Sequence, residues 1–460
     1  MSNFQQLNLP PQILKSITKK GYETPTPIQS QAIPALMEGS DLLGIAQTGT
    51  GKTAAFAWPI LTRLNKDKQV TRSKNVRTLI LTPTRELASQ INTNFRTYSE
   101  GMGVFSGVIF GGVGKKGQIT MMSKGCDILI ATPGRLLDLM NDGFIKFDQL
   151  EVFVLDEADR MLDMGFIHDI KRIIAKLPKE KQTMLFSATM PKAITSLVNT
   201  LLKNPKRVEV TPESSTVEKI DQKIYMVDQV NKLRLLKDLL KNDEIKSALV
   251  FTRTKHGADR VVKELTKVNI KSAAIHGNKS QAARERSLKI FKEGTIRVLV
   301  ATDIAARGID IDRVTHVFNY NLPEDAESYV HRIGRTARAG REGVSISFCE
   351  ATEVKFLKNV EKFIKYNIPV EEDHEYHVVH TKEEIEAEEK RKLEHKAKRL
   401  EMRKSSRPKT RNSQNARSGS IKTKAKAKAK SSSQGSAKSG TTRKKSSTKN
   451  NRTRTNRNRK

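Results

Sequence analysis

The sequence predicts an α/β protein with two parallel-sheet domains in tandem, followed by a disordered basic tail. Three observations lead to this fold class. The chain has 460 residues, too many for one ordinary domain. Short apolar runs alternate with amphipathic stretches along most of its length. Residues 403–460 contain 21 Lys and Arg but no acidic and no aromatic residue.

The short apolar runs are the expected strands. Continuous runs separated by helical stretches are typical of parallel strands covered by helices on both faces. They lie at 79–81, 128–130, 152–155 and 184–186 in the first half and at 248–251, 273–275, 298–300, 317–318 and 344–348 in the second. Between the halves, Pro205, Pro212 and a Ser/Thr cluster mark a break. We therefore expect domains over residues 1–208 and 218–370, joined by a linker over 209–217.

Polar segments directly follow most of these runs. They lie at 82–87, 131–135, 156–159, 187–189, 252–254 and 301–310. Ligands of open parallel sheets bind beyond the carboxyl ends of the strands. Each domain is therefore expected to present its chemistry along one sheet edge, and the two edges to face each other across a cleft.

The C-terminal region differs in composition from the rest. The tail 403–460 holds 21 of the net 34 positive charges, so that 13 remain on residues 1–402. It cannot bury enough apolar surface to offset its ordering entropy. A pI near 10.0 indicates a polyanionic partner, with nucleic acid favoured over an anionic membrane because the tail has no apolar face. Residues 371–402 are expected to form a solvated charged extension with a helix that opens at Thr381 and Glu384.

The cysteines and the N-terminal residues predict a protein of the reducing cell interior. Cys126 and Cys349 are far apart and have no metal-ligand spacing, so we expect two buried thiols. The first ten residues lack a signal layout, and no apolar run approaches 18 residues. These features predict a soluble, intracellular protein without a membrane partner.

A phosphate-binding loop follows the apolar residues Leu42, Leu43 and Ile45 and leads into an expected helix. Its residues are Ala46, Gln47, Thr48, Gly49, Thr50, Gly51, Lys52 and Thr53. Glycines and a helix N-terminus let backbone N–H groups close around phosphates. Lys52 is expected to reach the β/γ-phosphates of ATP, and Thr53 to coordinate Mg²⁺.

An acid pair and two arginines complete the predicted chemistry. Asp156 and Glu157 end a buried run; Asp156 is expected to hold Mg²⁺, partly through water, and Glu157 to orient and deprotonate the attacking water. Arg335 and Arg338 are three residues apart, so on a short helix they share a face and can stabilise charge on the leaving γ-phosphate. These arginines and the phosphate-binding loop are expected on different domains. The domains would then have to close for hydrolysis, which would make ATP a conformational switch.

At these residues the sequence closely resembles the DEAD-box RNA helicases of superfamily 2, especially the bacterial RhlE type, over about residues 1–350. Residues 156–159 read Asp-Glu-Ala-Asp, and 21–29 resemble the adenine-reading Q motif. The resemblance implies two tandem RecA-like domains, ATP as cofactor and a bacterial cytoplasmic RNA helicase. It assigns adenine hydrogen bonding to Gln29 and stacking to Tyr22 or Phe4, although the residues alone suggest that Phe4 is a core residue.

The resemblance also implies coupling and RNA-binding residues. Ser187, Ala188 and Thr189 would couple hydrolysis to strand separation, Asp303 would contact the ribose, and His331 would link to the acidic box. The implied RNA-binding residues are Pro83, Thr84, Arg85, Gly111, Gly112, Thr132, Pro133, Gly134, Arg135, Thr252, Arg253, Gln281, Arg284, Thr302, Arg307 and Gly308. Hydroxyls, glycine N–H groups and arginines suit sugar and phosphate, so we expect sequence-independent binding of a single strand or short duplex. Ala337 departs from the family, which usually has Gly there.

Two other functions remain alternatives. A DNA helicase or translocase would be stimulated by DNA rather than RNA. An RNA chaperone acting through its basic tail would separate duplexes over many turnovers even as a Glu157→Gln variant. Ribosomal precursors and the RNA-decay machinery are the candidate physiological partners; the sequence does not choose between them.

Overall fold

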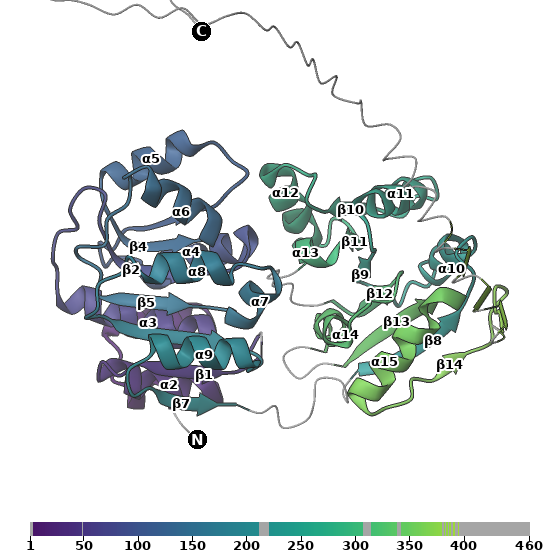
Figure 1. Ribbon diagram of the computed structural model, residues 1–460, viewed down its shortest axis with the longest axis horizontal. Coiled ribbons are helices and arrows are strands. Elements are labelled where there is room, and N and C mark those ends of the chain that lie inside the picture. The colour runs from purple at the N-terminus through teal and green to yellow at the C-terminus, as the bar shows by residue number, and fades with distance from the viewer. Residues whose placement is uncertain are drawn as a thin grey trace, which may run out of the picture. The chain divides into compact units, whose positions relative to one another are not determined.

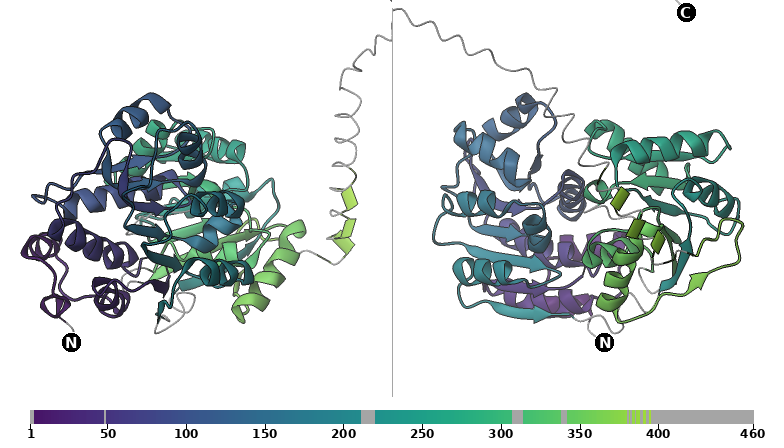
Figure 2. Two further views of the ribbon diagram at one scale, coloured as in Figure 1. Left: turned by 60° about the vertical axis from the view of Figure 1, so that its left-hand side comes forward. Right: turned by 45° about the vertical axis from the view of Figure 1, so that its right-hand side comes forward.

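The computed structural model describes residues 3–47, 49–210, 220–306, 314–337 and 342–379, with a few single positions between 381 and 394. Within this part of the chain, two seven-stranded sheets are formed, and every strand pair in them is parallel. Helices cover both faces of each sheet (Figures 1 and 2). The predicted tail 403–460, most of the linker, Thr48, Arg307, Gly308 and Arg338 lie outside the described residues.

The first sheet has the strand order β3-β4-β2-β5-β6-β1-β7. Its strands are β1 (Leu42–Ile45), β2 (Val76–Leu81), β3 (Ser106–Ile109), β4 (Cys126–Ala131), β5 (Val152–Leu155), β6 (Gln182–Ser187) and β7 (Lys206–Glu209). The four apolar runs expected in this half lie in β2, β4, β5 and β6. Strands β3 and β7 were not predicted, because both are short and mix polar with apolar residues.

The helices of the first half form the two layers that sandwich this sheet. They are η1 (Phe4–Leu7), α1 (Pro11–Lys19), α2 (Pro27–Met37), α3 (Lys52–Lys66), α4 (Arg85–Tyr98), α5 (Lys115–Ser123), α6 (Pro133–Asn141), α7 (Ala158–Asp163), α8 (Ile167–Ile174) and α9 (Lys192–Leu201). Alternate residues of the central strands face opposite cores: Val154 belongs to the same buried cluster as Trp58, and Phe153 to the cluster of Leu136 on the other face. Burial on both faces explains the continuous apolar runs.

The second sheet repeats the arrangement with the order β10-β11-β9-β12-β13-β8-β14. Its strands are β8 (Ile220–Met226), β9 (Ala248–Phe251), β10 (Ser272–Ile275), β11 (Val298–Ala301), β12 (His316–Asn319), β13 (Gly343–Cys349) and β14 (Val370–Glu371). Its helices are α10 (Lys232–Leu239), α11 (Lys255–Thr266), α12 (Gln281–Lys292), α13 (Asp303–Ala306), α14 (Ala326–Ile333), η2 (Ala351–Glu353) and α15 (Val354–Ile364). All five expected runs lie in strands, whereas β8 and β14 were not predicted.

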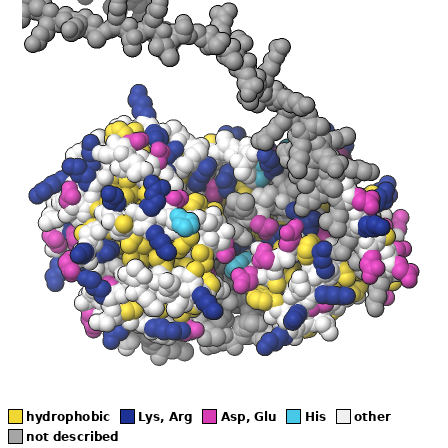
Figure 3. All heavy atoms as spheres, viewed as in Figure 1, with side chains coloured by type: hydrophobic (Ala, Val, Ile, Leu, Met, Phe, Trp, Pro, Cys, Tyr) yellow, Lys and Arg dark blue, Asp and Glu magenta, His cyan; other side chains and the backbone are white. Residues whose placement is uncertain are grey.

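Several smaller expectations can be compared with the described residues. Cys126 and Cys349 are buried free thiols, and burial raises the pKa of each to about 12. Thr381 and Glu384 form the expected capping box, in which each backbone N–H donates to the other residue's side chain. No helix in the described ranges combines the length and apolar character needed to span a membrane. Figure 3 shows Lys and Arg side chains interspersed with Asp and Glu over one face of the described part.

Candidate nucleotide and RNA sites at the strand ends

The phosphate-binding loop continues strand β1 and ends where helix α3 begins. Ala46 N–H donates to Ser187 O at 3.0 Å, so the loop leaves the sheet beside the end of β6. Gly49 and Gly51 have φ values of 87° and 93°, a left-handed conformation that favours glycine. The buried Lys52 ammonium donates to Ala46 O at 2.6 Å. The loop therefore curls around the lysine that was predicted to bind phosphate.

The Q segment packs directly on this loop. Gln29 is buried near the start of α2; its Oε1 accepts from Thr26 N–H at 3.0 Å, and its Nε2 donates to Gly51 O at 3.2 Å. A Cβ at Gly51 would overlap the Gln29 amide. Phe4 is 5% exposed and packs edge-on against Trp58, whereas Tyr22 is 43% exposed. Phe4 thus occupies the core position that the residues alone suggested.

The acid pair lies at the end of β5. Asp156 N–H donates to Leu81 O at 2.9 Å, and the carboxyl group is buried. Burial raises the pKa of Asp156 above its ordinary value, the nearby Lys52 charge opposes this shift, and the Glu157 charge adds to it. Glu157 has φ 54°, an uncommon conformation for a non-glycine residue, and its buried carboxylate pairs with Arg160 at 3.1 Å.

Asp159 connects the acidic box to the predicted coupling segment. Its Oδ2 accepts from Ala188 N–H at 3.0 Å, from Thr189 N–H at 2.8 Å and from the Thr189 hydroxyl at 3.1 Å. In return, Ser187 Oγ accepts from Asp159 N–H at 3.3 Å. Sequence reasoning placed Asp159 in the acidic box without giving it a role of its own, and it gave no role to Arg160, which follows that box.

The implied RNA-binding residues of the first domain come together at the ends of β2, β3 and β4. Thr84 caps α4 by accepting from Leu87 N–H at 3.3 Å. A Cβ at Gly112 would overlap the Arg85 guanidinium, so these two segments touch. Arg135 Nη2 donates to Val113 O at 3.0 Å, next to the same glycine loop. The remaining members lie in the same three segments: Pro83, Gly111, Thr132, Pro133 and Gly134.

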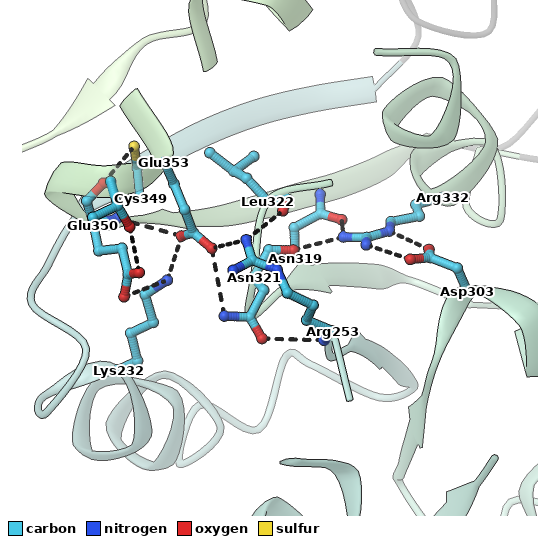
Figure 4. A network of polar contacts seen from close by, with 11 residues as sticks. Lys232, Arg253, Asp303, Asn319, Asn321, Leu322, Arg332, Cys349, Glu350 and Glu353 are labelled. Carbon is cyan, nitrogen blue, oxygen red and sulfur yellow. Dashed lines mark hydrogen bonds and ion pairs between the residues drawn. The ribbon is translucent and has the colours of Figure 1, made fainter. Parts of the chain in front are cut away.

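Arg332 organises the nucleotide-side residues of the second domain (Figure 4). Its buried guanidinium donates to both carboxylate oxygens of Asp303, at 2.6 and 2.7 Å. It also donates to Asn319 Oδ1 at 3.1 Å and to Asn321 O at 2.6 Å. Asp303, His331, Arg332 and Arg335 line one small cavity, and Arg335 Nε donates to His331 O at 3.3 Å. The predicted Asp303, His331 and Arg335 are thus brought together, around an arginine that sequence reasoning missed.

The described members of the implied RNA-binding set in the second domain lie at the ends of β9 and β11 and at the start of α12: Thr252, Arg253, Gln281, Arg284 and Thr302. Thr252 N–H donates to Ala301 O at 2.9 Å, which places it beside Thr302. Arg253 pairs with Glu353 at 2.8 Å. Gln281 and Arg284 contact the two carboxylate oxygens of Glu86, at 3.1 and 2.9 Å. Glu86 had no assigned role, although it directly follows the predicted Arg85.

The departure at Ala337 coincides with an unusual backbone. Ala337 has φ 53°, in the left-handed region that favours glycine. The usual glycine of the family would adopt this conformation without steric cost. The alanine therefore stores strain directly beside the predicted finger segment.

Comparisons with known proteins identify the family of this chain. Residues 26–197 match the DEAD/DEAH box helicase family and residues 231–340 the helicase conserved C-terminal domain. The chain is similar to the ATP-dependent RNA helicase CshA of Listeria monocytogenes, at 44% identity over 79% of this chain and 69% of that protein. It is also similar to the DEAD-box ATP-dependent RNA helicase RhpA of Helicobacter pylori, at 43% identity over 80% of this chain and 73% of that protein.

A solved structure of S. cerevisiae Dbp5 bound to RNA and ADP BeF3 is 31% identical, with a TM-score of 0.71 over 80% of this chain and 95% of that chain. The two parallel sheets accordingly form tandem RecA-like domains, as the resemblance implied. Family matches to both halves and relatives covered over more than two thirds of their length lead to one conclusion. The chain belongs to the DEAD-box ATP-dependent RNA helicases.

Proposed function

We propose that this helicase hydrolyses ATP at the Lys52 loop when RNA is bound, locally separates short RNA duplexes or remodels ribonucleoprotein, and uses the tail 403–460 as an RNA anchor. The observation that carries the proposal is the buried Lys52 ammonium, enclosed by its own loop and close to the acid pair. The Lys52 ammonium donates to Ala46 O in this structure, and a nucleotide phosphate would replace that carbonyl as its acceptor.

The nucleotide would be held by backbone and side chains of the first domain. The backbone N–H groups of the loop and of the start of α3 would bind the phosphates at the helix N-terminus. Lys52 would add a positive charge at the β/γ-phosphates. Gln29 is adjacent to Gly51 and is the adenine reader in this proposal. Tyr22, with 43% of its surface exposed, is better placed to stack on a base than the buried Phe4.

Mg²⁺ suits the oxygen donors that flank this loop. Thr53 offers a hydroxyl and Asp156 a carboxylate, and Mg²⁺ prefers a few such hard ligands together with water. Two protein oxygens do not fill the coordination shell of Mg²⁺, so a nucleotide and water would complete the ligand set. The ion would neutralise charge on the β/γ-phosphates.

Hydrolysis then depends on residues of both domains. Glu157 would orient the attacking water, and it must first loosen its pairing with Arg160. Arg335 and Arg338 would stabilise charge on the γ-phosphate, which requires the two domains to close on the nucleotide. Asp159 would transmit the state of this site to Ser187, Ala188 and Thr189 through the hydrogen bonds at their backbone.

RNA is the partner of this family, and the binding mode follows from the residue types. Hydroxyls, glycine backbone and arginines at the ends of β2, β3, β4, β9 and β11 suit sugar and phosphate rather than base edges. Binding would be independent of sequence, and contacts to the 2′-OH would select RNA. Bending of one bound strand would separate a short duplex, and hydrolysis would release it. The proposed location is the bacterial cytoplasm, and the proposed partners are ribosomal precursors or the RNA-decay machinery.

The nucleotide site is tested by Lys52→Ala. Loss of the charge at the β/γ-phosphates should abolish RNA-stimulated ATP hydrolysis, while RNA binding without nucleotide persists. The matched control is Lys66→Ala, at the exposed end of the same helix α3, which should keep wild-type turnover. ATP turnover close to wild type in Lys52→Ala would contradict the assignment.

The tail is tested by a chain that ends at Met402. Twenty-one positive charges without aromatic residues should bind by counterion release, which is blind to sequence and strongly salt-dependent. The truncated chain should keep its ATP turnover at saturating RNA, require more RNA for half-maximal stimulation and show a flatter dependence of log affinity on log salt. Identical salt slopes for the two chains would exclude the tail from RNA binding.

A further inference from the structure

A fully buried ion pair joins helix α10 to the segment before α15. Lys232 and Glu353 are both 0% exposed, and Lys232 Nζ contacts Glu353 Oε2 at 2.5 Å (Figure 4). Glu350 lies 3.8 Å from the same ammonium. Burying two charges is expensive unless each is paired and hydrogen-bonded. If the ion pair served stability alone, Lys232 and Glu353 would need no hydrogen-bond partners beyond each other.

The second oxygen of Glu353 has different partners. Oε1 accepts from Arg253 Nη2 at 2.8 Å and from Asn321 Nδ2 at 3.5 Å. Asn321 Oδ1 in turn accepts from Arg253 N–H at 3.2 Å. The buried acid and its amide neighbour therefore hold Arg253 at both its backbone and its guanidinium.

The Arg253 side chain is partly buried and partly open to solvent. It is 40% exposed, and its guanidinium lies 5.9 Å from the Phe356 ring centroid. Arginine is flexible, and a free side chain loses considerable rotamer entropy on binding a phosphate. A guanidinium anchored by one buried carboxylate has lost much of that freedom already, which favours binding.

The same network continues to the nucleotide side of the domain. Asn321 O accepts from Arg332 Nη1 at 2.6 Å, and Arg332 holds Asp303 through two hydrogen bonds. Figure 4 shows these side chains in one row from Lys232 to Asp303. Asn321 is the shared member, because it contacts Glu353, Arg253 and Arg332.

We propose that Glu353 is a positioning residue for RNA binding: fixed by Lys232, its carboxylate holds the Arg253 guanidinium in the orientation that grips the RNA backbone. This inference rests on the proposed RNA contact of Arg253. Glu353 itself is fully buried and so is closed off from a ligand at the surface. It acts only through the arginine.

Glu353→Gln tests the inference because it keeps the shape and removes one acceptor. The amide can offer its oxygen to Lys232 or to Arg253 but not to both. The RNA concentration for half-maximal ATPase stimulation should rise about tenfold, as expected when one charge-assisted hydrogen bond is lost. The KM for ATP at saturating RNA should change less than twofold. Glu361→Gln, in the adjoining helix α15 but outside the network, should change neither value.

A double-mutant cycle separates positioning from general destabilisation. Arg253→Ala should also raise the half-saturating RNA concentration, and adding Glu353→Gln to it should cause no further rise, since the acid acts through the arginine. An equal rise from Glu353→Gln with and without Arg253 would overturn the inference. So would a wild-type value in Glu353→Gln when Arg253→Ala is impaired. No effect of Arg253→Ala would instead overturn the proposed RNA contact, and the inference with it.

A second variant tests the same point if Glu353→Gln does not fold. Replacing the ion pair by apolar side chains of similar length, as in Lys232→Met with Glu353→Met, leaves neither charge of the pair in the core, and such replacements are often tolerated. Arg253 loses its carboxylate acceptor in this variant too, although its Nη2 still donates to Leu322 O at 3.4 Å. The half-saturating RNA concentration should therefore rise as in Glu353→Gln, and an unchanged value in the folded double variant would overturn the inference.

Discussion

The two RecA-like domains use opposite charges to organise the same kind of strand edge. In the first domain, buried Asp159 on α7 accepts hydrogen bonds from Ala188 and Thr189. In the second, buried Arg332 on α14 donates to Asp303, Asn319 and Asn321. Each residue ties a helix to a neighbouring strand end, one as acceptor and the other as donor.

The difference fits the ligands proposed above for each edge. An acidic centre orders backbone N–H groups and adds to the carboxylates of Asp156 and Glu157, which suits a site for a cation and its polyphosphate. A guanidinium centre neutralises Asp303; it lies on α14 together with His331, and Arg335 follows in the turn after this helix. The same architecture can therefore supply the negative part of a composite site in one domain and the positive part in the other.

The largest effect that this comparison predicts is that of Arg335→Ala. If the second domain supplies the positive charge, ATP turnover should fall by about 10³-fold, the range seen when arginine fingers are lost. ATP affinity should change much less, because the charge matters mainly in the transition state. The measurement is single-turnover hydrolysis alongside nucleotide titration, with the exposed Arg286→Ala of α12 as control. A parallel fall of affinity and turnover would make Arg335 a ground-state ligand.

A smaller effect is expected when the acidic centre loses its charge. In the wild type, backbone N–H groups donate to the Asp159 carboxylate, and Asp159→Asn leaves them one neutral acceptor oxygen. Hydrogen bonds to charged groups contribute about 1.5–3 kcal/mol each to stability. The rate of duplex separation should fall by about tenfold or more, and ATP turnover by a smaller factor. Both rates are measured on one preparation, with the exposed Asp163→Asn of the same helix as control. Equal losses in the two rates would argue against a coupling role.

The smallest expected effect concerns the strained Ala337. Glycine adopts φ 53° without steric cost, so Ala337→Gly should stabilise the protein by up to about 1 kcal/mol, despite the greater chain entropy of glycine. The opposite sign is expected for Ala282→Gly, which replaces an exposed alanine of ordinary helical conformation in α12. Thermal unfolding of the two variants gives the comparison. Destabilisation by Ala337→Gly would mean that the alanine side chain contributes packing that outweighs its strain.

Sequence reasoning succeeded where information is local. Continuous apolar runs predicted the central strands, and the loop, acid pair and family motifs identified segments that the structure does place at strand ends. The edge strands β7 and β14 were missed because their exposed residues are mixed in polarity. The organising residues were missed for another reason. Asp159 meets Thr189, Arg332 meets Asp303 and Glu353 meets Arg253, and these pairings across 30, 29 and 100 positions appear only after folding.

Strand order in the first sheet makes the segments proposed for RNA and those proposed for the nucleotide neighbours. The segments assigned to RNA follow β3, β4 and β2, and those assigned to the nucleotide follow β5, β6 and β1. The boundary between them is the single pairing of β2 with β5, where Leu81 O accepts from Asp156 N–H just before Pro83 and Thr84 begin the RNA segment. Adjacent strands are about 4.8 Å apart. Under the proposed assignments, a displacement of the RNA-binding segment after β2 would need to cross only one strand pairing to reach Asp156, the residue proposed to hold the metal.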